Sequence, residues 1–192
     1  MHRYLQPSEH IDFLDPIIQA EAQRLSDPAS SRLELIRRTF EFVRDEIKHS
    51  SDFKLNPVTC RASDVLRHKT GYCYAKAHLL AALLRANGIP TGLCYQRLSL
   101  SGSGAPFCLH GLNAVHIDGL GWYRVDARGN KQGVDAQFSP PREQLAFPVL
   151  ASQERDLPEI WAEPLPAIVE VLTRYQTYDQ VYAHLPDVDL FN

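Results

Sequence analysis

The sequence predicts an α+β protein in which helices come first and strands follow. Two observations support this fold class. Apolar residues recur at helical spacing through the first half of the chain, and two β-like runs flank an Asp-Gly turn after residue 106. Because helices and strands are segregated, we expect an antiparallel sheet covered by helices rather than βαβ units. A length of 192 residues suits one compact domain with short appendages.

Two helices are expected at the start of the chain. The first covers about residues 15–25, with Pro16 in its first turn, where proline is favoured. The second covers about residues 31–48, and its apolar residues follow gaps of three and four. This predicted buried stripe consists of Leu33, Ile36, Phe40, Val43 and Ile47. Arginines and acids alternate on the other face, which is typical of a solvated surface.

A third long helix is predicted to lie at the centre of the fold. After a loop at residues 50–57 and a short helix at residues 62–68, this helix starts at Cys73 and stops before Gly88 and Pro90. Residues 77–84 are apolar almost all round. A helix of this kind is covered on several sides.

The strands come next. Residues 91–98, 107–117 and 122–127 are β-like, and Asp118 and Gly119 predict a hairpin between the last two runs. The hairpin closes through either a two-residue turn or a three-residue loop, and the sequence leaves both open.

The C-terminal part of the chain is acidic. Residues 139–192 carry nine acidic and three basic side chains. We expect a short helix near residues 141–145 and another over residues 165–178. This segment either covers a groove or packs on the sheet.

Composition excludes several classes of protein. A net charge of −3 gives no general attraction to nucleic acid. The longest apolar run, from Leu79 to Leu84, is far shorter than the roughly 20 residues of a membrane span. The N-terminal residues lack the apolar core of a secretory signal, so a cytoplasmic location with free thiols is expected. The four cysteines form no Cys-x-x-Cys pair, and no metal or cofactor is expected.

Cys73 stands out among the cysteines. It lies where a loop containing Gly71 becomes the central helix. Unpaired N–H groups and the positive end of the helix dipole stabilise a thiolate there. We therefore expect Cys73 to be nucleophilic. Lys76 could add to this effect, although a solvated lysine is the simpler expectation.

A thiol nucleophile needs a base, and the base needs an orienting group. His110 on one hairpin strand and Asp126 on the other lie within one or two residues of direct opposition, whichever turn forms. His116 lies next to the turn, about 10–15 Å along the ladder from Asp126. The spacing therefore selects His110.

This arrangement is suited to attack on an acyl carbonyl. The backbone N–H of Cys73 can donate to the oxyanion. The sequence does not place a second donor, for which Asn56 and Tyr72 are weak candidates. Purely structural roles for Cys73, His110 and Asp126 are the alternative interpretation.

Three stretches of the sequence resemble the transglutaminase-like superfamily. The stretch from Gly71-x-Cys73 to Gly88-Ile-Pro90 is similar to its nucleophile motif. His110-Gly-Leu-Asn-Ala-Val resembles its histidine strand, and Gly121-Trp-Tyr-Arg-Val-Asp126 resembles its aspartate strand. The resemblance covers about residues 32–130 and is strongest to short bacterial members described as candidate cysteine proteases. Gly111 and Leu112 stand where the wider family prefers Ala-Trp.

The resemblance implies a papain-like cysteine-proteinase or transglutaminase-core fold, with a cysteine-bearing helix on an antiparallel sheet. It implies a single domain over residues 1–192. The core is expected at about residues 32–130, the N-terminal helical part at 1–31 and a C-terminal extension at 139–192.

The resemblance also implies a mechanism. Cys73 would be the nucleophile, His110 the general base and acid, and Asp126 the orienting group. A thioester resolved by water gives a peptidase or amidase, which we favour, with a peptide or protein amide as substrate. Resolution by an amine gives transamidation. Arylamine N-acetyltransferases use a similar triad, but their double glycine before the cysteine is absent here. A non-catalytic binding module is a further alternative.

Overall fold

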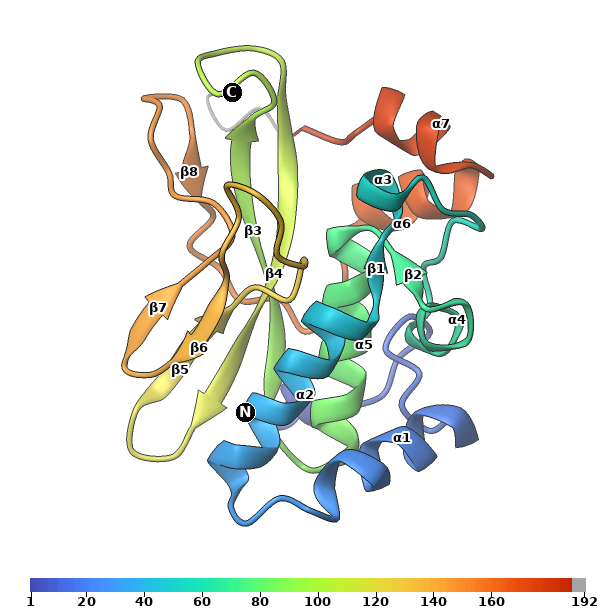
Figure 1. Cartoon of the computed structure of the whole chain (residues 1–192), viewed down its shortest axis with the longest axis vertical. Helices are drawn as coiled ribbons and strands as arrows, with labels where there is room; N and C mark the ends of the chain where they lie inside the picture. Colours follow the sequence, from blue (N-terminus) through green and yellow to red (C-terminus); the bar gives the residue numbers. More distant parts are fainter. Residues whose placement is uncertain (188–192) are drawn as a thin grey trace.

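The computed structural model describes residues 1–187; residues 188–192 of the predicted C-terminal extension lie outside the described part. Helices form one layer and an antiparallel sheet forms the other (Figure 1). Helix α5 (Cys73–Ala86) lies between α1 and α2 on one side and the sheet on the other. The predicted α+β class is confirmed.

The first two long helices are confirmed. A 3₁₀ turn, η1 (His2–Leu5), precedes α1 (Pro16–Ser26) and α2 (Arg32–Glu46). The Asp15 carboxylate accepts from the N–H of Ile17, and the Ser31 hydroxyl accepts from that of Glu34. These N-caps satisfy amides that a helix start would otherwise leave unpaired.

The buried face of α2 differs from the predicted stripe at one position. Leu33 lies in the first turn and is 45% exposed. Leu35 and Thr39 are buried instead, and the Thr39 hydroxyl donates to the Leu35 carbonyl, so its polar atom is satisfied. On the solvated face, Arg37 pairs with Glu34 and Glu41, as the charge pattern indicates.

Four short elements connect α2 to α5. They are β1 (Lys48–His49), α3 (Ser50–Phe53), α4 (Ala62–His68) and β2 (Thr70–Gly71). The predicted helix at residues 62–68 is confirmed, whereas the predicted loop at residues 50–57 begins with α3. β1 and β2 pair in parallel, with His49 opposite Gly71. This pairing brings His49 close to the start of α5.

The prediction that the central helix is covered on several sides is confirmed. Every residue of α5 from Cys73 to Arg85 is buried. The helix ends before Gly88, which takes φ +68°, a conformation that glycine adopts without steric cost. Among residues 1–187, no helix has both the length and the apolarity to cross a membrane.

The main sheet has the strand order β5-β4-β3-β8. Its strands are β3 (Thr91–Ser99), β4 (Phe107–Ile117), β5 (Gly121–Val125) and β8 (Arg155–Asp156). Asn113 lies opposite Val125, so the hairpin closes through the three-residue loop rather than the two-residue turn. His116 lies opposite Trp122, which confirms its place near the turn.

Two expectations for the C-terminal part are wrong. The structure has β6 (Gln137–Ser139), β7 (Arg142–Gln144), α6 (Pro166–Arg174) and α7 (Tyr178–Ala183). A hairpin thus replaces the predicted helix at residues 141–145, because residues before proline disfavour the α region and Pro140 and Pro141 are adjacent. The single helix predicted over residues 165–178 is two helices, separated where Tyr175 is extended.

Candidate active site

Cys73 is the first residue of α5, and its side chain lies at the junction of the helix layer and the sheet. The residue is 8% exposed. The backbone N–H of Gly111 on β4 donates to its Sγ at 3.5 Å. A Cβ at position 111 would lie 2.9 Å from Tyr74 Cδ1 and 3.1 Å from Tyr74 Cα. Glycine at this position therefore allows the start of α5 to contact β4.

His110 and Asp126 meet as the strand spacing predicts. His110 Nε2 lies 2.7 Å from Asp126 Oδ2, and both side chains are buried. The Asp126 carboxylate also accepts from the backbone N–H groups of Arg128 and Ala146, each at 3.1 Å. Because Nε2 faces the carboxylate, Nδ1 is the ring nitrogen left for another partner.

The charges of this pair support each other. Burial lowers the pKa of His110, but Asp126 and Cys73 outweigh it and raise that pKa to about 10. Burial opposes ionisation of Asp126, yet His110 and the two backbone donors lower its pKa. His110 is therefore protonated at neutral pH and interacts with both Asp126 and Cys73.

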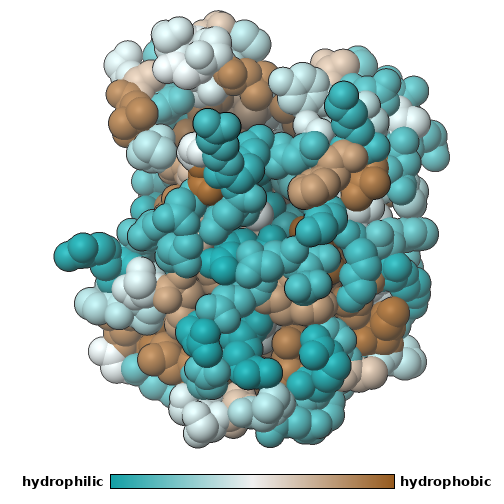
Figure 2. Space-filling view, in the orientation of Figure 1, coloured by the Kyte–Doolittle hydropathy of each residue, from teal (hydrophilic) through white to brown (hydrophobic). Residues whose placement is uncertain are grey.

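The three predicted residues lie at or beside one cavity of about 350 Å³. Cys73 and His110 line it, and Asp126 lies behind His110. Its walls come from β1, α3, the ends of β3 and β4, and the region of α7. Figure 2 shows the molecule hollowed at its upper edge, between the sheet and the α3 and α7 helices of Figure 1.

Sequence reasoning missed His49, a polar residue of this cavity. It is 6% exposed, and its ring meets Tyr72 edge-on with centroids 5.4 Å apart. Burial, and next Arg128, hold the pKa of His49 well below its usual range, so the ring is neutral. Its buried Nδ1 has no hydrogen-bond partner among residues 1–187. Only the parallel β1–β2 pairing reveals this placement, and two-residue strands give no sequence signal.

A charged group at the rim of the cavity was also missed. Asp52 on α3 accepts two hydrogen bonds from Arg128, at 2.5 and 2.9 Å, and one from Lys131 at 2.7 Å. Burial raises the pKa of Asp52, but the two cations lower it to about 2. This network ties the segment after Asp126 to the segment after His49.

Two expectations about neighbouring side chains need correction. Asn56 does not line the cavity; its Oδ1 accepts from the N–H of Tyr178. Tyr72 does line it, but its hydroxyl donates to the Tyr178 carbonyl. Lys76 is buried rather than solvated, because its ammonium donates to the carbonyls of Ile47 and Arg44 at the end of α2. Burial lowers the pKa of Lys76 to about 7.

The remaining cysteines differ from Cys73 in their surroundings. All four are free thiols. Burial raises the pKa of Cys60, Cys94 and Cys108 to about 12 in each case. These three thiols are protonated at neutral pH and belong to the packing.

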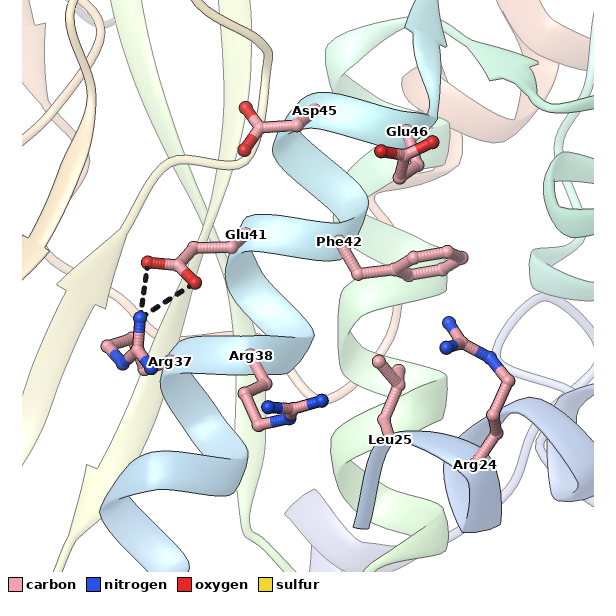
Figure 3. A pocket seen from close by; sticks show the side chains of 8 residues that line it. All are labelled: Arg24, Leu25, Arg37, Arg38, Glu41, Phe42, Asp45 and Glu46. Atoms are coloured by element: carbon pink, nitrogen blue, oxygen red, sulfur yellow. Dashed lines mark hydrogen bonds and ion pairs between the residues drawn. The ribbon is translucent and has the colours of Figure 1, made fainter. Parts of the chain in front are cut away.

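A larger hollow lies away from Cys73, between α1 and α2. Its volume is about 500 Å³, and the charged side chains around it include Arg24, Arg37 and Glu41 (Figure 3). Arg37 pairs with Glu41, and Arg24 pairs with Glu21. Within residues 1–187, no group of three or more His, Cys, Asp or Glu side chains could hold a metal ion.

The geometry agrees with the comparison to known families. The model of the transglutaminase-like superfamily matches residues 19–127, which is more than half of the chain and contains Cys73, His110 and Asp126. The chain belongs to the transglutaminase-like superfamily. No curated protein matches its sequence.

Solved structures are similar to this chain, and the first shares its fold. A protein from Cytophaga hutchinsonii described as a candidate cysteine protease superposes with a TM-score of 0.54 and 21% identity, over 65% of this chain and 40% of that one. The periplasmic domain of TgpA from Pseudomonas aeruginosa superposes with a TM-score of 0.47 and 22% identity. The match covers 65% of this chain and 45% of that one. The chain therefore spans less than half the length of these two structures.

Proposed function

We propose that the protein is a thiol enzyme that acts on amide bonds through Cys73, His110 and Asp126, most simply as a cysteine peptidase or amidase. The observation that carries the proposal is the position of His110, whose ring hydrogen-bonds Asp126 at 2.7 Å and interacts with Cys73 in one cavity. Membership of the superfamily supports it.

The proposed reaction has two steps. The Cys73 thiolate attacks the amide carbonyl, and His110 gives its proton to the leaving amine as a thioester forms. His110 then takes a proton from water as the water oxygen attacks the thioester, which releases the acid and regenerates the Cys73 thiolate beside a protonated His110. Asp126 accepts from Nε2 throughout and keeps Nδ1 available for both transfers.

The oxyanion requires hydrogen-bond donors on its side of the carbonyl. The N–H of Cys73 at the start of α5 is one candidate. We assign the second role to His49, because its neutral ring lines the same cavity and carries a hydrogen on one nitrogen. His49→Gln should retain much of the activity, whereas His49→Phe should lower kcat by roughly 10²-fold or more.

Covalent labelling tests the function directly. Peptide amide substrates carrying a fluorogenic leaving group should be turned over by the wild type but not by Cys73→Ala. Intact mass spectrometry of the wild type during turnover should show the acyl adduct on Cys73. Absence of both turnover and adduct across a diverse peptide library would leave a binding module as the better interpretation.

The molecule that attacks the thioester on Cys73 distinguishes hydrolysis from acyl transfer: water gives hydrolysis, and an amine gives acyl transfer. A primary amine added to the reaction tests for transamidation, which would give an amide product by mass spectrometry. An acetyl donor tests for chemistry of the arylamine N-acetyltransferase kind. We expect release of the free acid in both mixtures.

We also propose that the protein acts in the cytoplasm. The support is that all four cysteines are free, as expected of a protein in a reducing compartment. Fractionation of the source cells, followed by detection with an antibody, tests this location.

A further inference from the structure

The chain that follows α7 reaches β4 beside the cavity that contains Cys73 and His110. After α7 it crosses to the upper ends of β3 and β4 (Figure 1). The N–H of Leu109 donates to the Pro186 carbonyl at 2.7 Å. Leu185 lines the cavity that contains Cys73 and His110. The returning segment thus hydrogen-bonds to β4 one residue before His110.

The edge of β4 explains why this contact is possible. β5 pairs with β4 only from Asn113 to Ile117. Over residues 107–112, no described strand pairs with the side of β4 that faces away from β3. Unpaired backbone N–H and C=O groups at such an edge can hydrogen-bond to a further segment, which is how many proteins bind peptides.

A buried arginine recognises the next residue of the segment. Arg97 on β3 is 8% exposed, and its Nε and Nη2 donate to the two oxygens of Asp187 at 2.7 and 2.6 Å. Its Nη1 donates to the Gln153 carbonyl at 3.1 Å, and the guanidinium lies over the Phe107 ring at 4.0 Å. These contacts hold the planar Arg97 guanidinium in an orientation in which it can bind both oxygens of a carboxylate.

We propose that the Leu109 N–H, the Arg97 guanidinium and the apolar wall of the cavity form a peptide-binding subsite, which the chain's own residues 185–187 occupy. Its ligand class is an extended peptide with an apolar side chain followed two positions later by a carboxylate. This inference rests on the proposed function, because it names the substrate class of the same cavity.

The segment can leave without undoing the helix before it. α7 is held at its start, where the Asn56 side chain accepts from the N–H of Tyr178 and the Tyr72 hydroxyl donates to the Tyr178 carbonyl. Val181 is fully buried in the core. None of these contacts involves residues 185–187, so the subsite can exchange its own segment for a peptide in trans.

Peptide binding to the full-length protein tests the subsite. All proteins carry Cys73→Ser, so that binding is measured without catalysis. The probe is a fluorescein-labelled peptide with the sequence of residues 182–187, Tyr-Ala-His-Leu-Pro-Asp, with an amidated end, followed by fluorescence polarisation. Asp187→Asn should bind it about tenfold or more tightly than the parent, because the tethered competitor loses a charged hydrogen-bonding pair. Leu185→Ser should also raise the affinity for the peptide, because the tethered segment loses its apolar contact with the cavity.

Matched controls separate this subsite from a structural strap. Adding Arg97→Gln to Asp187→Asn should abolish the gain, and a probe ending in Asn should bind about tenfold or more weakly. Glu170→Gln, on the exposed face of α6, should behave as the parent. Equal binding by parent, Asp187→Asn and Leu185→Ser, all shown folded by thermal melting, would overturn the proposal. So would binding indifferent to Arg97 or to the peptide carboxylate. Neither outcome depends on turnover, so failure of the proposed function would be seen separately.

Discussion

At the scale of single residues, the surroundings of each cysteine determine how reactive its thiol is expected to be. Cys73 lies beside a protonated His110, whereas burial raises the pKa of the other three cysteines to about 12. The thiolate is the reactive form of a cysteine, so the three thiols whose pKa is raised should react slowly, whereas Cys73 lies at the start of a helix beside an imidazolium. The four cysteines should therefore separate into one reactive thiol and three inert ones.

Alkylation by iodoacetamide at pH 7 checks this separation. Cys73 should be modified at least roughly tenfold faster than Cys60, Cys94 or Cys108, as measured by peptide mass mapping of the folded protein. His110→Ala should slow modification of Cys73 and leave the others unchanged. Equally slow modification of all four thiols would contradict the catalytic interpretation.

The carboxylate of Asp126 should control the pH range of activity. The pKa of His110 is raised to about 10, so its proton is present below that pH and lost above it. We expect kcat/KM to fall on the alkaline side near pH 10. Asp126→Asn should move this fall to lower pH and reduce kcat by roughly 10³–10⁴-fold, because the amide neither stabilises the imidazolium nor fixes the tautomer. An unchanged profile would remove Asp126 from the mechanism.

At the scale of elements, the contact between α5 and β4 positions Cys73, the proposed nucleophile. Gly111 lies against Tyr74, and the Tyr74 hydroxyl donates to the carbonyl of Leu109 on the same strand. The Asn113 side chain donates to the Ala77 carbonyl at 2.9 Å one turn further along the helix. These contacts fix the start of α5 relative to the strand that carries His110.

Gly111→Ala should disturb this contact. The new methyl group would lie 3.1 Å from the Tyr74 Cα, which cannot move independently of the helix. Overpacking of this kind costs typically about 1–3 kcal/mol, measurable by urea denaturation, and activity should fall with it. Gly104→Ala is the matched control, since among residues 1–187 no atom beyond the adjacent residues lies within 4 Å of a Cβ placed at position 104. Equal stability of the two variants would show that α5 and β4 can separate freely.

At the scale of the whole molecule, one buried arginine connects segments that lie far apart in the sequence. Arg85 near the end of α5 is 2% exposed and donates to the carbonyls of Thr91, Gln6 and Ala162, between 2.7 and 2.9 Å. It thereby connects the N-terminal segment, β3 and the chain that precedes α6 to the central helix. Burial lowers the pKa of Arg85 to about 10, so it is charged at neutral pH.

Arg85→Met should lower the free energy of unfolding by roughly 3–5 kcal/mol. Three carbonyls would lose their donor in a buried site, and each unsatisfied buried group costs about 1–3 kcal/mol before relaxation. Urea denaturation followed by circular dichroism measures the change. Arg174→Met serves as the control, because that side chain is 65% exposed and should change stability little. A similar change in both variants would show that Arg85 has no special role.

The sequence by itself determined the long helices α1, α2 and α5, the β4–β5 hairpin and the three residues of the candidate triad. These predictions rest on local patterns: caps and apolar spacing for α1, α2 and α5, and a ladder whose period fixes which residues can face each other. His110 and Asp126 lie on adjacent strands joined by a short loop, so their separation follows from counting along the strands. The prediction of a short helix at residues 141–145 was wrong because Pro141 disfavours the α region at Pro140 and because β7 pairs with β6.

The tertiary structure alone decided what surrounds the candidate triad. His49 reaches the cavity through a two-residue strand, Lys76 is buried by carbonyls of another helix, and residues 185–187 return to β4 from the far end of the chain. Each depends on contacts between segments widely separated in sequence. Local spacing carries no information about such contacts, because the energies that favour them arise only once α5 and the sheet have packed together.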